Sequence, residues 1–268
     1  MSLSIKKTKE LLETLTESAK DYFFPQYSDS SADKAHERIC HSVKKLCGEE
    51  KAQAFLQKLD CISQLIHTDV QAIAENDPAA SCEREIIFCY PAVTAMLHYR
   101  TAHVLLQLGV PVIPRMLTEH AHSVTGIDIH PAASIGEGFA IDHGTGIVIG
   151  ETTIIGNNVT LYQGVTLGAK NIRRDSDGNP ANLPRHPILE DGVTVYSNAS
   201  ILGRITIGEN SVIGGNVWLT HSVKKNSRVL QGKTQEVFSD GGGIKKKKLL
   251  LLFSLVRLPL RQIHIKLE

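Results

Sequence analysis

The sequence is poor in aromatic residues, and its cysteines form no pattern that would cross-link the chain or bind a metal. Phe, Tyr and Trp make up 5% of the 268 residues, and there is one Trp. So few rings suit a narrow core of Ile, Val and Leu. The cysteine count is odd and includes no Cys-x-x-Cys pair, which argues against a disulfide framework and a structural zinc site. We therefore expect a reducing, cytoplasmic compartment, and we interpret the cysteines as small buried side chains on helix faces; they are Cys40, Cys47, Cys61, Cys82 and Cys89.

The chain also lacks a strong net charge and a long apolar run. The formal net charge is +1, but residues 245–268 hold seven of the 29 basic residues and one of the 28 acidic ones. The remaining 22 basic and 27 acidic residues make the body mildly acidic, which excludes the basic surface of a nucleic-acid-binding protein. No apolar stretch near the N-terminus is long enough for a signal peptide. The run Leu249–Leu260 is too short to span a bilayer, which takes about 20 residues.

The first half of the chain has the pattern of an all-α domain. Ser4 can cap the first helix, Pro25 ends it, and Asn76-Asp77-Pro78 interrupts a later one, because proline disfavours helix at the residue before it. Gly109 is the expected end of a long helix that starts at Pro91. The predicted helices cover residues 4–24, 32–47, 49–75, 80–89, 91–108 and 115–123. The pattern changes abruptly at Gly126.

From Gly126 to about Leu230, aliphatic residues recur every six positions. The three series are Ile129, Ile135, Ile141; then Ile149, Ile155, Leu161, Leu167; then Leu189, Val195, Ile201, Ile207, Ile213, Leu219. A period of six fits neither a helix nor a single strand. It is typical of a parallel β-helix, in which three six-residue units close one triangular turn and equivalent side chains stack from coil to coil. A β-sandwich would instead show alternation at two. We expect an α-helical domain over 1–125, a left-handed β-helix over 126–232 and a tail over 233–268.

Function is expected where the period is interrupted, because the regular coil is only a scaffold. A polar loop over residues 169–187 separates the second and third series, and a slip of two residues separates Ile141 from Ile149. The polar residues at these points are Asp128 and His130, Asp142 and His143, Glu151, Arg185 and His186. Asp128 and His143 are fifteen residues apart, so they can approach one another on neighbouring coils. A carboxylate beside an imidazole favours a histidine general base.

These residues resemble a known family. The segments Asp-Ile-His-Pro, Asp-His-Gly-Thr-Gly-Ile-Val-Ile-Gly-Glu-Thr, Gly-Val-Thr-Leu-Gly and Arg-His-Pro on a hexapeptide coil resemble serine O-acetyltransferase. The resemblance extends into the helical half through residues 68–73 and 76–79. It implies an acyltransferase that makes O-acetyl-L-serine from L-serine and acetyl-CoA in cysteine biosynthesis. It also implies a homotrimer or hexamer with each active site between two adjacent coils.

The resemblance assigns roles residue by residue. His143 is similar to the base that deprotonates the serine hydroxyl, and Asp128 to its orienting carboxylate. The residues that match the amino-acid pocket, which also holds the inhibitor L-cysteine, are Asp77, Pro78, Asp142, Arg185 and His186, with Glu151 near the transferred group. Gly168, Ala169, Ser197 and Gly215 match the coenzyme A groove. No metal is implied, and direct attack through a ternary complex, without an acyl-enzyme, is the expected route.

Several alternatives stay open at this stage. A related enzyme could acetylate a sugar or antibiotic hydroxyl, although Arg185 and Asp77 suit a zwitterion. A hexapeptide carbonic anhydrase would need three converging histidines, for which His130, His143 and His186 are the candidates. A purely structural coil is a third alternative.

The end of the chain raises separate expectations. Ser239-Asp240-Gly241-Gly242-Gly243-Ile244 resembles the family's ending, whose Ile enters O-acetylserine sulfhydrylase. We expect residues 245–268 to be foreign to the evolved domain, from a frame change or cloning artefact; attachment to a membrane surface is the functional alternative. With this tail attached, Ile244 has no free carboxylate for the sulfhydrylase to capture.

Overall fold

The computed structural model describes residues 3–171 and 183–232. The middle of the predicted loop and the tail, including Ile244, lie outside the described residues. Residues Met1–Gln231 form one compact unit. The expected boundary at 125/126 falls where the last helix ends, while the division into separate domains stays a prediction.

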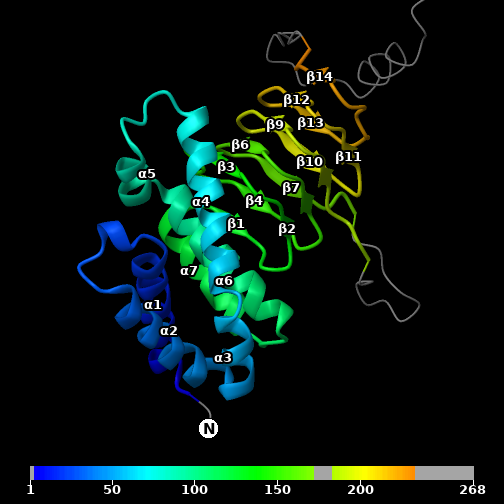
Figure 1. The fold of residues 1–268 in the computed structure, drawn as a ribbon. Coiled ribbons are helices and arrows are strands. Elements are labelled where there is room, and N and C mark those ends of the chain that lie inside the picture. The colour runs from blue at the N-terminus through cyan, green and yellow to red at the C-terminus, as the bar shows by residue number, and fades with distance from the viewer. Residues whose placement is uncertain (1–2, 172–182, 233–268) are drawn as a thin grey trace, which may run out of the picture. The chain divides into compact units, whose positions relative to one another are not determined.

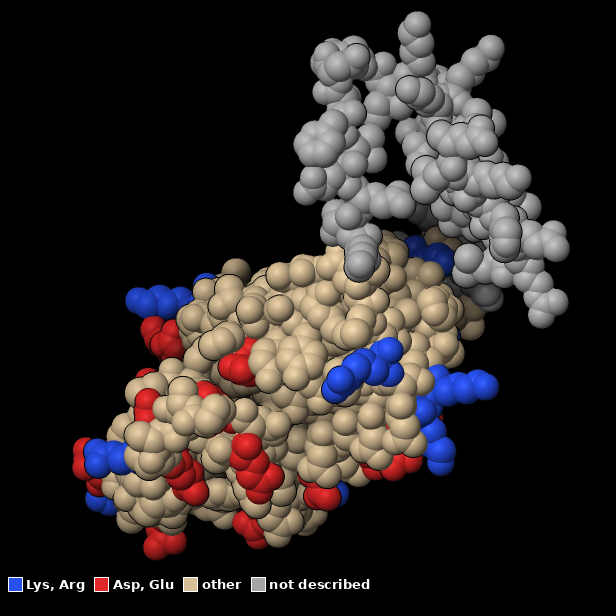
Figure 2. Space-filling model, turned by 90° about the horizontal axis from the view of Figure 1, so that it is seen from above, with Lys and Arg blue, Asp and Glu red and all other residues tan. Residues whose placement is uncertain are grey.

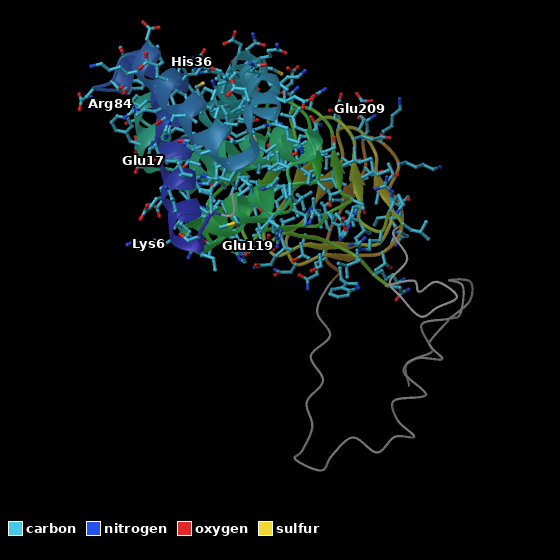
Figure 3. The ribbon with its side chains drawn as sticks, turned by 90° about the horizontal axis from the view of Figure 1, so that it is seen from below. Lys6, Glu17, His36, Arg84, Glu119 and Glu209 are labelled. Atoms are coloured by element: carbon cyan, nitrogen blue, oxygen red, sulfur yellow. The ribbon has the colours of Figure 1, made fainter. Side chains whose placement is uncertain are left out.

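The helical half contains seven α-helices and a short 3₁₀ turn in the described residues (Figure 1). Ser4 caps the first α-helix as predicted, since its hydroxyl accepts a hydrogen bond from the Lys7 amide. Lys6 and Glu17 on this helix point outward (Figure 3). The elements are α1 (Ile5–Phe23), η1 (Pro25–Tyr27), α2 (Ala32–Cys47), α3 (Glu49–Leu56), α4 (Leu59–Asn76), α5 (Glu83–Cys89), α6 (Pro91–Gln107) and α7 (Ile113–Thr125).

The prediction of one continuous helix over residues 49–75 is wrong. The span 49–75 is divided into α3 and α4 at Gln57 and Lys58. The Lys58 amide donates to the Phe55 carbonyl at 2.9 Å, which is the tighter spacing of a 3₁₀ turn. Because neither Gly nor Pro marks this position, periodicity gave no sign of the break.

The prediction that the cysteines are buried is also wrong. Cys40 and Cys47 are half-buried, and Cys61, Cys82 and Cys89 are exposed; all five are free thiols. On α4 the buried stripe runs through Ile62 and Ile66, so Cys61 lies beside it. Cys82 precedes the short α5 and Cys89 is its last residue, while the buried residues of this helix are Ile86 and Ile87.

Helix α6 is the central helix of this half, and it is buried along most of its length. A helix that is apolar on all sides must be covered on all sides, and α6 contacts α1, α4, α7 and the coil. It contains His98, which is 6% exposed. The His98 Nδ1 lies 2.8 Å from the Thr94 carbonyl, and burial lowers the pKa of His98 to about 4.

This buried histidine predicts a loss of stability in acid. The pKa of His98 in the folded protein, about 4, lies below the ordinary value of 6.5. Between these two pH values the unfolded chain binds a proton at His98 and the folded protein does not. The free energy of unfolding therefore decreases as the pH falls from 6.5 towards 4. From pH 7 to pH 5 we expect His98 to account for about 2 kcal/mol of lost unfolding free energy. Urea unfolding at both pH values should show a smaller loss in His98→Gln, and an unchanged loss in the control His41→Gln on the surface of α2. Equal pH dependence in wild type and His98→Gln would contradict this assignment.

The second half is a parallel β-helix, so the predicted fold class is confirmed. Its strands are two or three residues long and form three walls. The first wall is β1-β4-β7-β10-β13, the second is β11-β8-β5-β2, and the third is β14-β12-β9-β6-β3. The strands are β1 (Asp128–Ile129), β2 (Ser134–Ile135), β3 (Ala140–Asp142), β4 (Val148–Ile149), β5 (Ile154–Ile155), β6 (Thr160–Tyr162), β7 (Thr166–Gly168), β8 (Ile188–Leu189), β9 (Thr194–Val195), β10 (Ser200–Leu202), β11 (Thr206–Ile207), β12 (Val212–Ile213), β13 (Trp218–Leu219) and β14 (Arg228–Val229).

The strand register shows how the interruptions fit into the coil. Thr166 pairs with Val148, eighteen positions earlier, which is one regular turn. The slip lengthens the first turn, where Asp128 pairs with Val148. The loop is added at one corner, and Ser200 pairs with Thr166 on either side of it. All thirteen residues of the three series are buried, with at most 8% exposure. The predicted column of aliphatic side chains is therefore confirmed.

The surface has no dominant charge on the face shown in Figure 2, where acidic and basic side chains are both scattered. This agrees with the nearly balanced composition. Among the described residues, none of the helices combines the length and the hydropathy needed to cross a membrane.

Candidate active site

The predicted site residues of the coil lie at two of its edges, on either side of the first wall. The edge where the first wall turns into the second contains His130, Glu151, Gly168, Ala169, Arg185 and His186. The edge where the third wall turns into the first contains Asp142, His143, Ser197 and Gly215. The structure therefore brings the predicted residues into two groups rather than one.

The first group is built around Thr152, and we call Glu151, Thr152, Arg185 and His186 the Arg185 cluster. The Thr152 hydroxyl oxygen accepts hydrogen bonds from the Arg185 amide at 2.9 Å and the His186 amide at 3.1 Å. Arg185 forms an ion pair with Glu151. Thr152 thus fastens the returning end of the long loop onto the preceding coil.

His186 is held as a neutral ring with its proton on Nε2. Its Nδ1 accepts a hydrogen bond from the Thr152 amide at 3.0 Å, so this nitrogen has no proton, and the tautomer follows from that donor. The ring is 7% exposed, and burial, followed by the charge of Arg185, lowers the pKa of His186 to about 4. A Cβ on Gly150 would come within 2.2 Å of the ring, so only glycine fits there. His186 is therefore a hydrogen-bond donor at neutral pH.

The second group surrounds His143, which projects from the slip in the coil. His143 has a positive φ of 56°, and the Gly144 amide donates to the Asp142 carbonyl at 2.7 Å across it. This is a γ-turn with a strained backbone of the kind found at functional sites. The ring is exposed, and its Nδ1 lies 3.5 Å from Asp142 Oδ1. A Cβ on Gly144 would collide with Ile127, so the turn requires glycine at this position.

Two helix ends complete the second group, and we call Asp77, Tyr90, Asp142 and His143 the His143 cluster. Asp77 follows the last residue of α4, and Tyr90 precedes the first residue of α6. The Tyr90 hydroxyl donates to Asp77 at 2.5 Å. This hydrogen bond lowers the pKa of Asp77, with a smaller contribution from nearby His143, and raises the pKa of Tyr90 to about 12. Pro78 lies in the exposed turn that follows Asp77.

Asp128 does not have the partner that the sequence predicts. Among the described ion pairs, its carboxylate lies 3.7 Å from Nη1 of Arg115 on α7, and it forms none with His143. Asp142 is the carboxylate that lies beside the His143 ring. The sequence spacing could not show this, because α7 folds back against β1 from outside the repeat.

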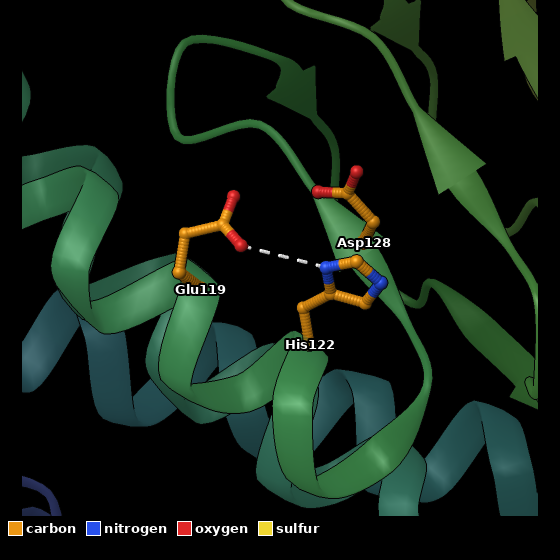
Figure 4. Close-up of side chains that lie close together, drawn as sticks. All are labelled: Glu119, His122 and Asp128. Carbon is orange, nitrogen blue, oxygen red and sulfur yellow. Dashed lines mark ion pairs between the residues drawn. The ribbon is translucent and has the colours of Figure 1, made fainter.

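Asp128 also belongs to a small cluster with Glu119 and His122 of α7 (Figure 4). Their candidate ligand atoms lie within 4.8 Å of one another. The guanidinium of Arg115 already pairs with both carboxylates. Because a cation is thus in place, the three side chains are explained as an ion-pair network.

A cleft of about 440 Å³ lies beside the Arg185 cluster. Its lining includes three cationic side chains, Lys170, Arg185 and Arg204, and the apolar Leu183 and Leu202. Arg204 also donates to the carbonyls of Thr152 at 2.7 Å and His186 at 3.1 Å. Gly168 pairs with Leu202 on the wall of this cleft. A basic, partly apolar cleft suits a phosphorylated ligand with an extended organic chain.

Four residues with a place in the site were not found from the sequence: Tyr90, Arg115, Thr152 and Arg204. Each acts through a contact with a residue outside its own helix, strand or corner. Thr152 follows Glu151 directly, and a polar residue at the corner opposite the loop end is the only signal that could have indicated it.

The chain matches known proteins over both of its halves. Residues 186–221 match the family described as bacterial transferase hexapeptide (six repeats). The serine acetyltransferase, plasmid, of Synechococcus elongatus is 52% identical over 197 residues, which are 73% of this chain and 62% of the relative. The chain thus spans less than two thirds of that relative's length.

Two solved structures agree in fold. Serine acetyltransferase isoform 3 of Entamoeba histolytica, in complex with cysteine, superposes with a TM-score of 0.74 at 34% identity, covering 91% of this chain and 87% of that one. Serine acetyltransferase of Brucella abortus strain S19, in complex with coenzyme A, has a TM-score of 0.62 at 28% identity, covering 83% and 81%. The Entamoeba structure shares both the helical half and the hexapeptide coil with this chain, at 34% identity and over 87% of its own length. The chain therefore belongs to the serine acetyltransferase family.

Proposed function

We propose that this chain transfers the acetyl group of acetyl-CoA to the hydroxyl of L-serine. The observation that carries the proposal is the chemical division of the two clusters. Arg185 and His186 supply a cation and an N–H donor, which suit the carboxylate of an amino acid. Asp77 and Asp142 supply carboxylates, which suit its ammonium group. Together they match a zwitterion, and the family and its cysteine-bound relative support this substrate class.

In the proposed mechanism His143 is the general base. Its ring is exposed at a strained turn and can take the proton of the serine hydroxyl. The oxygen then attacks the thioester carbonyl, a tetrahedral intermediate collapses, and the coenzyme A thiolate leaves and accepts the proton. With both substrates bound together, orientation supplies much of the rate, and no acyl-enzyme is needed.

His186 is the other histidine that could serve as base, and its geometry disfavours that role. A base acting near neutral pH needs a free nitrogen lone pair and a pKa near the working pH. The Nδ1 lone pair of His186 is occupied by the Thr152 amide, and its pKa is about 4. We propose that His186 Nε2–H instead binds the substrate carboxylate. Asp142, with Asp128 as the second candidate, orients His143, and Glu151 holds Arg185.

We further propose that the active site is completed between two chains. The Arg185 cluster and the His143 cluster lie at different edges of the first wall, so one coil does not enclose a substrate between them. A cyclic trimer would place the first edge of one coil against the second edge of its neighbour. The proposed coenzyme A residues divide in the same way, with Gly168 and Ala169 at one edge and Ser197 and Gly215 at the other. Acetyl-CoA would occupy the groove so formed, with the basic cleft at its side.

The function is tested with substrates that differ in one charged group. We expect O-acetyl-L-serine from L-serine and acetyl-CoA, and kcat/KM about 100-fold lower with L-serinamide, because a charge-assisted hydrogen bond to Arg185 is lost. L-cysteine, which has the same zwitterion, should compete with L-serine. Mass spectrometry of the products and initial rates would measure both. Equal rates for L-serine and L-serinamide, or preferential acetylation of a sugar, would refute the proposal.

The interaction of Ile244 with O-acetylserine sulfhydrylase, and its loss when residues 245–268 follow, stay proposals. Both concern residues outside the described part of the chain.

A further inference from the structure

The helical half is attached to the coil by a buried ion pair. Arg100 of α6 and Asp69 of α4 are 4% and 2% exposed. The guanidinium meets the carboxylate in two hydrogen bonds, from Nη2 at 2.9 Å and from Nε at 3.2 Å. Removing one partner of such a pair leaves a buried charge, whereas keeping both does little for stability by itself. Stability alone therefore does not account for this ion pair.

Both members of the pair also hold the first turn of the coil. Arg100 donates to the carbonyls of Ile135 at 2.6 Å and Gly136 at 2.5 Å. Asp69 accepts from the Phe139 amide at 3.0 Å. The neighbouring Thr68 hydroxyl accepts from Gly138 at 3.1 Å. The corner 135–139 is thus bound on both sides, directly before β3, which ends at Asp142.

The same two helices carry Asp77 and Tyr90 at their ends. Asp77 lies eight residues beyond Asp69, which is about 12 Å along α4 at 1.5 Å per residue. Tyr90 lies ten residues before Arg100 on α6. The hydrogen bond between Tyr90 and Asp77 ties the two ends together. A tilt of α4 by about 5° at the ion pair would move Asp77 by about 1 Å over that length, a displacement large enough to impair catalysis.

We propose that Asp69 and Arg100 are positioning residues that set the distance between Asp77 and His143. The ion pair fixes α4, α6 and the corner before β3 as one body, so that the carboxylate of Asp77 and the turn at His143 face the same substrate. This proposal rests on the proposed function, since it assigns Asp77 to the ammonium group of serine. It makes the helical half a part of the active site instead of an appendage.

The test uses Arg100→Lys, which keeps the charge but loses the two-pronged geometry, and Asp69→Asn, which keeps the shape. Each should raise the KM for L-serine and the Kd for L-cysteine about tenfold, with the KM for acetyl-CoA within about twofold of wild type. Tyr99→Phe is the matched control. The Tyr99 hydroxyl donates a buried hydrogen bond from α6 to the Ala133 carbonyl of the coil at 2.6 Å, and this bond does not involve α4. The substitution should lower stability and leave the serine KM unchanged.

A double-mutant cycle separates positioning from general damage. In an Asp77→Asn background, Arg100→Lys should no longer change the Kd for L-cysteine in calorimetry, because the group it positions is gone. Additive effects, or equal kinetic effects of Arg100→Lys and Tyr99→Phe, would overturn the proposal. Loss of folding in both Arg100→Lys and Asp69→Asn would also overturn it, since the pair would then serve folding alone.

Measurements on the wild-type protein distinguish failure of the proposed function from failure of the positioning role. If the unmodified protein neither acetylates L-serine nor binds L-cysteine, the substrate assignment fails. Hydrogen exchange of the Gly138 and Phe139 amides then still tests the ion pair, which should protect both amides in wild type and in Tyr99→Phe but not in Arg100→Lys. Equal protection in all three proteins would count against it.

Discussion

Replacement of His143 by alanine is expected to lower kcat by about two to four orders of magnitude, the range for removal of a positioned base. The ring lies at a γ-turn and is 72% exposed, so the variant should keep the wild-type thermal midpoint. Steady-state rates with L-serine and acetyl-CoA, together with circular dichroism, would measure both. The KM for acetyl-CoA should change little, because the base acts on the other substrate.

Two comparisons make this result specific. His41→Ala removes an exposed histidine from α2 and should leave the rate unchanged. His186→Ala should chiefly raise the KM for L-serine, because we assign that ring to substrate binding. A near-normal kcat in His143→Ala, with a large loss of kcat and an unchanged KM in His186→Ala, would show that the base is His186 instead.

A mixture of two impaired variants, His143→Ala and His186→Ala, is expected to regain activity at L-serine concentrations well below the raised KM of His186→Ala, and this is the second large effect. If each site takes its His143 cluster from one chain and its Arg185 cluster from the next, a trimer that mixes His143→Ala and His186→Ala chains contains intact sites. Random mixing of equal amounts makes about a quarter of all sites intact in a cyclic assembly. The activity should therefore rise from a small residual value to about a quarter of wild type.

The mixing experiment requires exchange of subunits. The two variants would be denatured together and refolded, or co-expressed with different tags and purified through both. Refolding each variant alone is the control, and it should give no recovery. No recovery in verified mixed oligomers would mean that both clusters act within one chain. A fully active monomer by light scattering would refute the shared site directly.

The repeat is the part of the fold that could be predicted most fully. A residue such as Ile201 points into the coil because every sixth position stacks on its equivalent, a local rule repeated along the chain. Positions that break the rule, such as His143 and Arg185, are visible for the same reason. The break between α3 and α4 follows no local rule, since it carries no Gly or Pro, and it was missed.

The partners of the site residues could not be predicted in the same way. Asp128 and His143 are fifteen residues apart and were expected to pair across neighbouring coils, but the ion-pair partner of Asp128 is Arg115, which lies on α7 outside the repeat. The tautomer of His186 depends on a hydrogen bond from the amide of Thr152, which lies 34 residues earlier. Contacts of this kind depend on how separate segments pack, and residue spacing contains no information about it.

The amino-acid sequence by itself determined the two-part architecture, the coil and its core, and the residues at which the coil is interrupted. These follow from periodicity and from residue type, which act locally. Only the tertiary structure decided that those residues form two clusters on opposite edges of one wall, that His186 is a neutral donor, and that α4 and α6 hold Asp77 near the turn at His143. The physical reason is that burial, hydrogen-bond partners and charge at a side chain come from segments brought together by folding.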